Sequence, residues 1–491
     1  MTNQTSTSDI LHKATRSVKW SALTEMVTRT VPPLVFVVLA KLLTPEDYGV
    51  VGTAMIAIAF CQMFWDAGLS KALVQTKDSP LDAAQVVFWT NLVLGGVVYV
   101  ILFAGAPWIA NFFHSPKSAL VLRVLGLQVI IASFTSVQQA LLMREMDFRN
   151  LFWIKLLTAF VPGVFSIPLA FYGQGVWALV AGTLAGQMVN LGLLWRQSTW
   201  RPRWEYSAVL ARRLFGFGFW VALEGLGIWL MQWSDNIVVG RFLGVHELGV
   251  YRTGLMMVAI VFGLALNPIV PVLYPAFSRM QDDLPALSRI FHRINRTVIA
   301  FALPIGTGLL LLGPEVVAVL FGAKWQGLGM VVSVLGFSAG ISWTVCLNAE
   351  VYRATGIPKM TALIMWLHLI IYLPAYWVSA HYGLQTFIYT RLGLVFVGEV
   401  IQIVFIVKLL GVSPFYLWHE GKTMILSTAA MVGVVLMAKA LLWGYVAGVA
   451  GWLELALLVA LGVVSYIGTL WILDRPFVLS FRGMIRKVAR P

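Results

Sequence analysis

Hydrophobic residues gather in long runs along the chain, and short polar or turn-rich segments separate these runs. A transmembrane helix needs about 20 predominantly apolar residues, and fourteen of the runs approach that length. This pattern predicts an all-α polytopic membrane protein with about 14 transmembrane helices. The centres of the runs lie near Thr30, Phe60, Leu94, Ile131, Val161, Gly186, Gly227, Phe262, Pro304, Leu335, Ile371, Val395, Ala430 and Leu461.

The chain also contains an internal repeat. Residues 40–50 (AKLLTPEDYGV) align with residues 240–250 (GRFLGVHELGV) at an offset of 200, and two shorter matches recur at an offset of 210. An even number of helices in each half would relate the halves by an axis along the membrane normal, as in transporters that bind substrate between parallel repeats. We therefore predict two six-helix halves (1–205 and 206–410), two further transmembrane helices (411–475) and a basic amphipathic tail (476–491).

Composition agrees with the hydrophobic pattern. Of the 491 residues, 59% are hydrophobic and 11% are charged, whereas soluble domains carry roughly a quarter charged residues. Little of the chain is left for an aqueous domain. The two cysteines lie inside apolar runs without CxxC spacing, so we expect neither a disulfide framework nor a structural zinc site.

The net charge of +14 would suggest a nucleic-acid partner in a soluble protein. Here the positions of the basic residues favour a topological explanation instead. With the N-terminus inside, 26 of the 35 Lys and Arg residues fall in cytoplasmic segments and 5 fall in outer loops. This bias predicts that both ends are cytoplasmic. We expect a multi-pass protein of the bacterial inner membrane, a retained first helix in place of a signal peptide, and no nucleic-acid partner.

The C-terminal segment alternates apolar and basic residues from Phe477 to Arg490. This pattern predicts an amphipathic helix that lies on the anionic inner leaflet. A frayed basic tail is the alternative interpretation.

Three ordered segments resemble the polysaccharide transporter family of oligosaccharide flippases: 39–49 (LAKLLTPEDYG), 65–75 (WDAGLSKALVQ) and 235–244 (DNIVVGRFLG). The superfamily of that family also contains multidrug exporters and the lipid II flippase. The resemblance implies that the chain is a transporter and not an enzyme. Its implied cargo is an undecaprenyl-pyrophosphate-linked oligosaccharide for lipopolysaccharide or exopolysaccharide biosynthesis, flipped by ion-coupled alternating access. The implied partners are this lipid-linked oligosaccharide, membrane lipids, and glycan polymerase or export machinery.

Eleven charged residues fall within the predicted helices, where a charge is costly unless it faces water or a partner. These positions are the natural places to look for substrate and ion sites. They are Arg29, Arg123, Arg252, Arg391, Glu25, Asp66, Glu224, Asp235, Glu350, Glu399 and Glu454.

The four arginines are candidates for binding the pyrophosphate, because a guanidinium group can donate two parallel hydrogen bonds to it. Arg29 and Arg391 are the leading candidates, although Arg29 also has Glu25 four residues earlier as an ion-pair partner on the same helix face. Arg123 and Arg252 lie near the outer surface, where snorkelling of the side chain to the interface is the favoured interpretation.

The acidic candidates suggest ion coupling. Glu25 lies 16 residues before Lys41 and Glu224 lies 17 residues before Arg241, so the two acids occupy near-equivalent places in the halves. A buried pair of this kind suits a coupling proton or sodium ion, and we expect no other cofactor or metal. A helix-packing ion pair in each half is the alternative.

Two further acids lie in the family segments. Asp235 suits ion binding or the capping of loop amides, and we expect a structural hydrogen bond for Asp66. Glu350, Glu399 and Glu454 have no motif support and stay unassigned.

Two other functions compete with the flippase. A multidrug or cation antiporter on the same fold would need a smaller, more acidic cavity. A membrane glycosyltransferase or polymerase would need a catalytic carboxylate in a substantial outer loop, but the predicted outer loops are short. They hold only Glu46, Asp47, Glu247 and Glu315. In the flippase, the two helices after residue 410 are expected to provide a groove for the polyprenyl tail.

Overall fold

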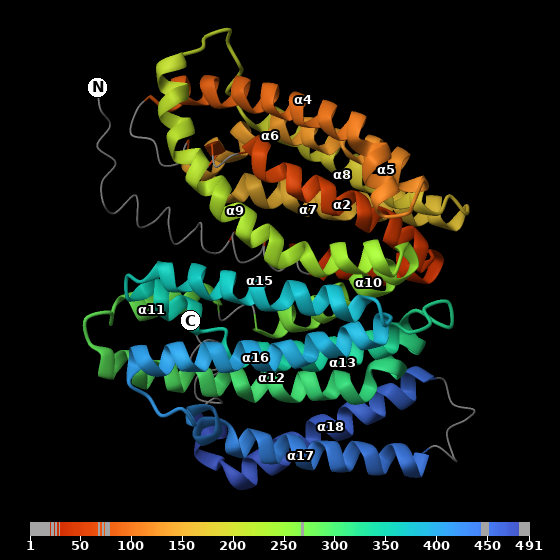
Figure 1. The fold of residues 1–491 in the computed structure, drawn as a ribbon, viewed down its shortest axis with the longest axis vertical. Coiled ribbons are helices and arrows are strands. Elements are labelled where there is room, and N and C mark those ends of the chain that lie inside the picture. The colour runs from red at the N-terminus through yellow and green to blue at the C-terminus, as the bar shows by residue number, and fades with distance from the viewer. Residues whose placement is uncertain are drawn as a thin grey trace. The chain divides into compact units, whose positions relative to one another are not determined.

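The structure is a computed structural model that describes residues 30–66, 79–266, 270–442 and 451–480, together with residues 20, 24, 27, 28, 69, 70 and 73. Within these residues, the side chains of 64–66, 80, 209–210, 212–224, 270–272, 274, 358 and 442 are not described. In the described part of the chain, the regular elements are all helices and no strand occurs (Figure 1).

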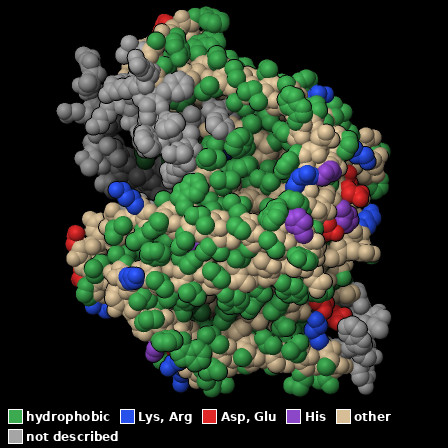
Figure 2. All heavy atoms as spheres, in the orientation of Figure 1, with side chains coloured by type: hydrophobic (Ala, Val, Ile, Leu, Met, Phe, Trp, Pro, Cys, Tyr) green, Lys and Arg blue, Asp and Glu red, His purple; other side chains and the backbone are tan. Residues whose placement is uncertain are grey.

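Eleven of the described helices are long and apolar enough to cross a membrane, with lengths of 22 to 37 residues and mean hydropathies of 1.4 to 2.2. Large apolar side chains such as Val100, Phe171 and Ile370 are 64%, 78% and 69% exposed, as a lipid-facing surface requires. On the face in Figure 2, hydrophobic side chains cover the middle of the helices and charged ones lie toward their ends. The predicted all-helical membrane fold is therefore confirmed, while the number fourteen stays a prediction.

The chain divides into two compact units, residues 1–252 (unit 1) and 253–491 (unit 2). The division falls inside helix α10 (Val245–Leu266). The predicted halves, with boundaries at 205 and 410, were drawn from the sequence repeat and stay a prediction.

Unit 1 is a bundle in which small residues allow close helix packing. Ser166 of α7 donates a hydrogen bond of 2.7 Å to the carbonyl of Ala178 in α8, and a Cβ on Gly182 would collide with Ser166. Such small-residue contacts are typical of helices that associate in lipid. Besides the start of α10, the unit contains α2 (Pro45–Asp66), α4 (Pro80–Phe112), α5 (Lys117–Leu125), α6 (Leu127–Arg144), α7 (Phe148–Phe171), α8 (Val176–Gln197) and α9 (Ala208–Phe242).

Unit 2 is organised around its longest helix, α12 (Leu284–Leu320). On one side, α12 packs against α13 (Leu328–Ser342), and a Cβ on Gly306 would lie 2.8 Å from the Cα of Gly340. On another side it contacts α17 (Tyr416–Leu442) and α18 (Gly451–Leu473), which also pack on each other. The remaining elements are α11 (Val270–Ser278), the 3-10 turn η1 (Trp343–Val345), α14 (Asn348–Ala354), α15 (Pro358–Ala380) and α16 (Leu384–Leu410).

The two copies of the repeated motif lie against each other within unit 1. The start of α2 and the start of α10 are so close that neither Gly49 nor Gly249 has room for a Cβ. Residues that differ by 200 in number exchange equivalent contacts, as a two-fold relation requires. The pairs are Gly49 with the carbonyl of Val245, Gly249 with the carbonyl of Pro45, and Glu46 with His246 at 3.7 Å (Oε1 to Nδ1).

Candidate functional site

The structure describes the side chains of four of the eight residues predicted to serve in binding, coupling or a motif. Arg123, Arg252 and Asp235 belong to unit 1, and Arg391 belongs to unit 2. The other four predictions fall outside the described side chains: Arg29 and Glu25 lie outside the described residues, and Glu224 on α9 and Asp66 on α2 have side chains that are not described. All eight roles stay predictions.

Asp235 is a buried carboxylate that has several hydrogen-bond donors. It lies on α9 with 5% of its surface exposed. Its Oδ2 accepts a bond of 2.7 Å from the Tyr251 hydroxyl. Its Oδ1 accepts from the backbone N–H and the Nδ2 of Asn236, at 2.7 and 2.8 Å. These bonds replace the water that burial removes, so the charge is well stabilised where it is.

Arg252 lies in the same cluster. Its guanidinium carbon is 4.6 Å from the centre of the Trp233 ring, and the guanidinium interacts electrostatically with Asp235. A cation over an aromatic face is stabilised by the ring quadrupole. The structure therefore brings together Arg252, a phosphate candidate, and Asp235, an ion-binding candidate.

Arg123 does not join that cluster among the contacts described. Its Nε donates a bond of 3.2 Å to the carbonyl of Phe103 in α4, and its guanidinium carbon lies 4.8 Å from the centre of the Phe103 ring. These contacts connect α5 to α4.

Arg391 and a carboxylate that was left unassigned, Glu399, lie on the same helix of unit 2. Eight residues separate them on α16, about 12 Å at a rise of 1.5 Å per residue. Both interact electrostatically with Tyr372 of α15. Glu399 is 9% exposed, and its Oε2 accepts one long bond of 3.5 Å from the Thr344 hydroxyl. Glu399 was visible in the sequence as an intramembrane charge, but no motif distinguished it from its neighbours.

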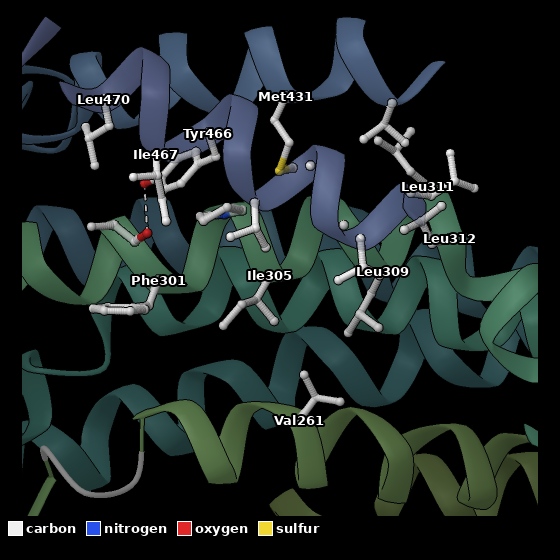
Figure 3. A pocket seen from close by; sticks show the side chains of 18 of the residues that line it. Val261, Phe301, Ile305, Leu309, Leu311, Leu312, Met431, Tyr466, Ile467 and Leu470 are labelled. Atoms are coloured by element: carbon white, nitrogen blue, oxygen red, sulfur yellow. Dashed lines mark hydrogen bonds between the residues drawn. The ribbon is translucent and has the colours of Figure 1, made fainter. Parts of the chain in front are cut away.

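An apolar cavity of about 540 Å³ lies between α12, α17 and α18 of unit 2 (Figure 3). Phe301, Ile305 and Leu309 of α12 and Ile467 of α18 project into it, and no charged side chain is among the residues that line it. Its one hydroxyl, on Tyr466, donates a bond of 2.8 Å to the carbonyl of Ala300. The walls thus offer an acyl-like ligand an almost purely hydrophobic surface.

Ion pairs lie at both ends of this apolar cavity. At one end Arg296 pairs with Asp474 and covers the ring of the lining residue Phe477 at 5.2 Å. At the other end Lys439 pairs with Glu315 at 2.5 Å and donates a bond of 3.0 Å to the carbonyl of a lining leucine. These pairs connect α12 to α17 and α18 and so hold the cavity walls together.

Unit 1 has a pocket of about 670 Å³ with the opposite character. It lies at the ends of α4, α6 and α8, beside the segment 197–205. Gln85 organises its wall by accepting a bond of 2.7 Å from the backbone N–H of Arg203 and donating one of 3.4 Å to the carbonyl of Arg201. The charged residues that line the pocket are Asp82, Glu145, Asp147, Glu205, Arg201 and Arg203.

Comparisons with known proteins agree on one protein class. Residues 38–329 match the profile of a family described as polysaccharide biosynthesis protein. The succinoglycan biosynthesis transport protein ExoT of Rhizobium meliloti (strain 1021) is 28% identical over 352 residues, which cover 72% of this chain and 71% of ExoT.

Two solved structures share the fold. The lipid II flippase MurJ aligns with a TM-score of 0.76 at 12% identity, covering 94% of this chain and 100% of the MurJ chain. A multidrug resistance MATE family transporter in an inward-facing conformation aligns with a TM-score of 0.62 at 15% identity, covering 81% of this chain and 99% of that one. At these identities, the likeness establishes the fold alone.

Proposed function

The chain belongs to the polysaccharide biosynthesis protein family, and from this premise we propose that it flips a lipid-linked oligosaccharide across a membrane. In finer detail, the cargo is an undecaprenyl-pyrophosphate-linked oligosaccharide for lipopolysaccharide or exopolysaccharide biosynthesis, moved from the inner to the outer leaflet of a bacterial inner membrane. The transport role of ExoT, given by its name, supports a transporter and not an enzyme.

The observation that carries this proposal is the apolar cavity of unit 2. A polyprenyl chain is a long hydrocarbon that must stay out of water while its polar head crosses the bilayer. The cavity between α12, α17 and α18 has the size of typical ligand pockets, about 300–1,000 Å³, and its walls are almost entirely apolar. It lies at the helices of 411–475, where the groove for the tail was expected.

The polar head needs cations. We assign the pyrophosphate to Arg29 and Arg391, with Arg123 and Arg252 as secondary candidates, and the coupling ion to Glu25, Glu224 and Asp235. The halves would alternate access while both chain ends stay cytoplasmic. Glycan polymerase or export machinery would receive the flipped product.

A multidrug antiporter is the second candidate, favoured by the shared fold with the MATE transporter. Lipophilic drug cations call for a carboxylate in the binding cavity, because burial of an unpaired charge is costly. No carboxylate lines the apolar cavity of unit 2, so the cavity suits a neutral hydrocarbon better.

The test is to delete the gene and identify the lipid-linked oligosaccharide that accumulates on the inner leaflet. Accumulation of one such species, reversed by the wild-type gene, is the expected result. Unchanged lipid-linked glycans together with increased drug sensitivity would overturn the flippase and favour the antiporter.

A further inference from the structure

The pocket of unit 1 at the ends of α4, α6 and α8 has no part in the flippase scheme above. We call it the polar pocket. Its volume of about 670 Å³ lies within the range of typical ligand sites, about 300–1,000 Å³. Carboxylate, guanidinium, amide and hydroxyl groups all line it. Such a wall suits a ligand that is itself rich in hydrogen-bonding groups.

Hydrogen bonds hold the wall of the polar pocket in shape. Gln85 of α4 is 5% exposed, accepts a bond of 2.7 Å from the backbone N–H of Arg203, and donates one of 3.4 Å to the carbonyl of Arg201. The guanidinium of Arg201 donates a bond of 2.6 Å to the carbonyl of Ser198, directly after α8. These bonds attach the segment 197–205 to α4 and α8. A pocket that is formed in advance pays a smaller ordering cost when a ligand binds.

Other polar groups of the wall are unused. Within the part of the chain that the structure describes, the carboxylates of Asp82, Glu145 and Glu205 form no ion pair and accept no hydrogen bond, and all three are exposed. Trp200 also lines the pocket and is 8% exposed, and its Nε1 is buried without a hydrogen-bond partner. Buried polar groups are nearly always satisfied, so an unpaired donor indicates a ligand or a water that binds there.

Two observations narrow the class of ligand. Among the described residues, no group of three or more His, Cys, Asp or Glu side chains could hold a metal ion, so these carboxylates do not form a chelating site. The pocket is lined by four acidic and two basic residues, and this balance disfavours phosphates, nucleotides and other anions. An uncharged ligand with many hydroxyl groups agrees with both observations.

An exposed aromatic ring borders the polar pocket. Trp204 lies between two lining residues, Arg203 and Glu205, and is 90% exposed. One face of its ring stacks on Trp89, with the ring centres 4.3 Å apart. The Nε1 of Trp89 donates a bond of 2.7 Å to the carbonyl of Arg203, which fixes the ring pair to the pocket wall. The C–H groups of a sugar ring are slightly positive and pack well on the negative face of an aromatic ring.

We propose that the polar pocket binds sugar residues of an uncharged oligosaccharide. Asp82, Glu145 and Glu205 accept hydrogen bonds from its hydroxyl groups, and such charge-assisted bonds are stronger than neutral ones. The Arg203 guanidinium donates to its oxygens, and the Trp204 ring packs against a sugar face. Identifying this oligosaccharide as the glycan of the cargo rests on the proposed function. Under the predicted topology this end of unit 1 is cytoplasmic, so the glycan would bind here before it is flipped.

The test measures binding of a free oligosaccharide to the purified full-length protein by titration calorimetry. The probe is the uncharged fraction obtained by partial acid hydrolysis of the surface polysaccharide of the strain that encodes this chain, and it carries neither lipid nor phosphate. We expect saturable binding. Asp82→Asn and Glu145→Gln, which keep the side-chain shapes, should each weaken it by about tenfold, as the loss of a hydrogen bond to a charged group does.

Two tryptophan variants test the aromatic contribution. Trp204→Ala should weaken binding by about a few-fold, because a sugar face loses its packing surface. Trp108→Ala is the matched control, since Trp108 is 77% exposed and lies near the other end of α4; it should bind as the wild type does. Asp82 lies in the first turn of α4, where an acid stabilises the helix, so Glu145→Gln decides the matter if Asp82→Asn does not fold.

A wild type that does not bind the probe, or pocket variants that bind it as the wild type does, would overturn the site. Binding of an arginine-rich peptide in place of the oligosaccharide would also overturn it and would assign the pocket to a basic protein partner. The readout involves no transport. Accumulation of a lipid-linked glycan in the deletion strain without probe binding would retain the proposed function and overturn the pocket, and probe binding without such accumulation would do the reverse.

Discussion

Two buried carboxylates, Asp235 of unit 1 and Glu399 of unit 2, differ in how fully their hydrogen bonds are satisfied. In unit 1, Asp235 accepts three hydrogen bonds, and the guanidinium groups of Arg252 and Arg123 lie over aromatic rings. In unit 2, Glu399 has one long hydrogen bond and neighbours with unsatisfied oxygens. Burial of a charge therefore identifies a binding site poorly, whereas burial without a partner identifies a place with unused binding capacity.

The cavities of the two units also differ in the charge of their walls. The pocket of unit 1 is lined by six charged residues, whereas the residues that line the cavity of unit 2 include none. Within the described residues, the cavity with apolar walls therefore belongs to unit 2 and the pocket with charged walls belongs to unit 1. Four experiments test this comparison.

The largest effect is expected for the leading arginines, one from each unit's residue range. Arg29→Ala and Arg391→Ala should each abolish glycan export, because loss of two charge-assisted hydrogen bonds, each worth about 1.5–3 kcal/mol, corresponds to at least about a hundredfold. Export is measured as surface glycan at equal protein abundance. Arg475→Ala, which removes an arginine whose guanidinium carbon lies 5.7 Å from the centre of the Trp471 ring and which has no assigned role, is the control and should retain most export. Full export by both leading variants would contradict the assignment of Arg29 and Arg391 to the pyrophosphate.

A smaller loss is expected when the apolar cavity is filled. Gly308 lines the cavity, and a Cβ there would meet open space, so Gly308→Leu places an isobutyl group into it. We expect export to fall about tenfold, corresponding to about 1.4 kcal/mol. Gly468→Leu is the matched control, since Gly468 of α18 also has open space around its Cβ but does not line the cavity. Equal export by the two variants would show that the cavity holds no tail.

Glu224→Gln tests whether the pair of acids predicted from the sequence, Glu25 and Glu224, takes part in ion coupling. The predicted result is weaker dependence of export on the ion gradient, by a few-fold, because the neutral amide cannot bind and release a proton or a cation. Export is compared before and after the proton and sodium gradients are collapsed in turn. If the Glu224→Gln variant keeps the full gradient dependence of the wild type, coupling belongs elsewhere.

The smallest effect is expected from a comparison of two buried tyrosine hydroxyls, one with a hydrogen-bond partner and one without. Tyr251→Phe removes a donor from the buried Asp235 and should lower the free energy of unfolding by about 1.5–3 kcal/mol. Tyr352→Phe removes a buried hydroxyl without a hydrogen-bond partner, so its cost should stay below about 1 kcal/mol. Thermal or denaturant unfolding of both variants gives the two values. A larger cost for Tyr352→Phe would contradict the contrast between the surroundings of Asp235 and those of Glu399.

The fold was largely predictable because hydrocarbon thickness imposes a length and a polarity on every spanning helix. The repeat was also readable, and Gly49 and Gly249 prove to be spatial counterparts. Other features depend on residues far apart in the chain. Thr344 and Glu399 are 55 residues apart, and the apolar cavity joins segments from Val261 to Val478. No local sequence pattern predicts contacts between such distant residues. The helix interruption at Trp343–Val345 contains no proline from which it could have been predicted.

The contact of Gly49 and Gly249 has a consequence for how this chain can change over generations. In a homodimer, one mutation alters both sides of a symmetric interface at once. Here the two sides are encoded separately, and each glycine faces the other copy's backbone with no room for a methyl group. A side chain gained at either position would therefore meet a partner that had not changed with it. The two copies can diverge in sequence elsewhere, but at this contact each copy limits which substitutions the other can tolerate.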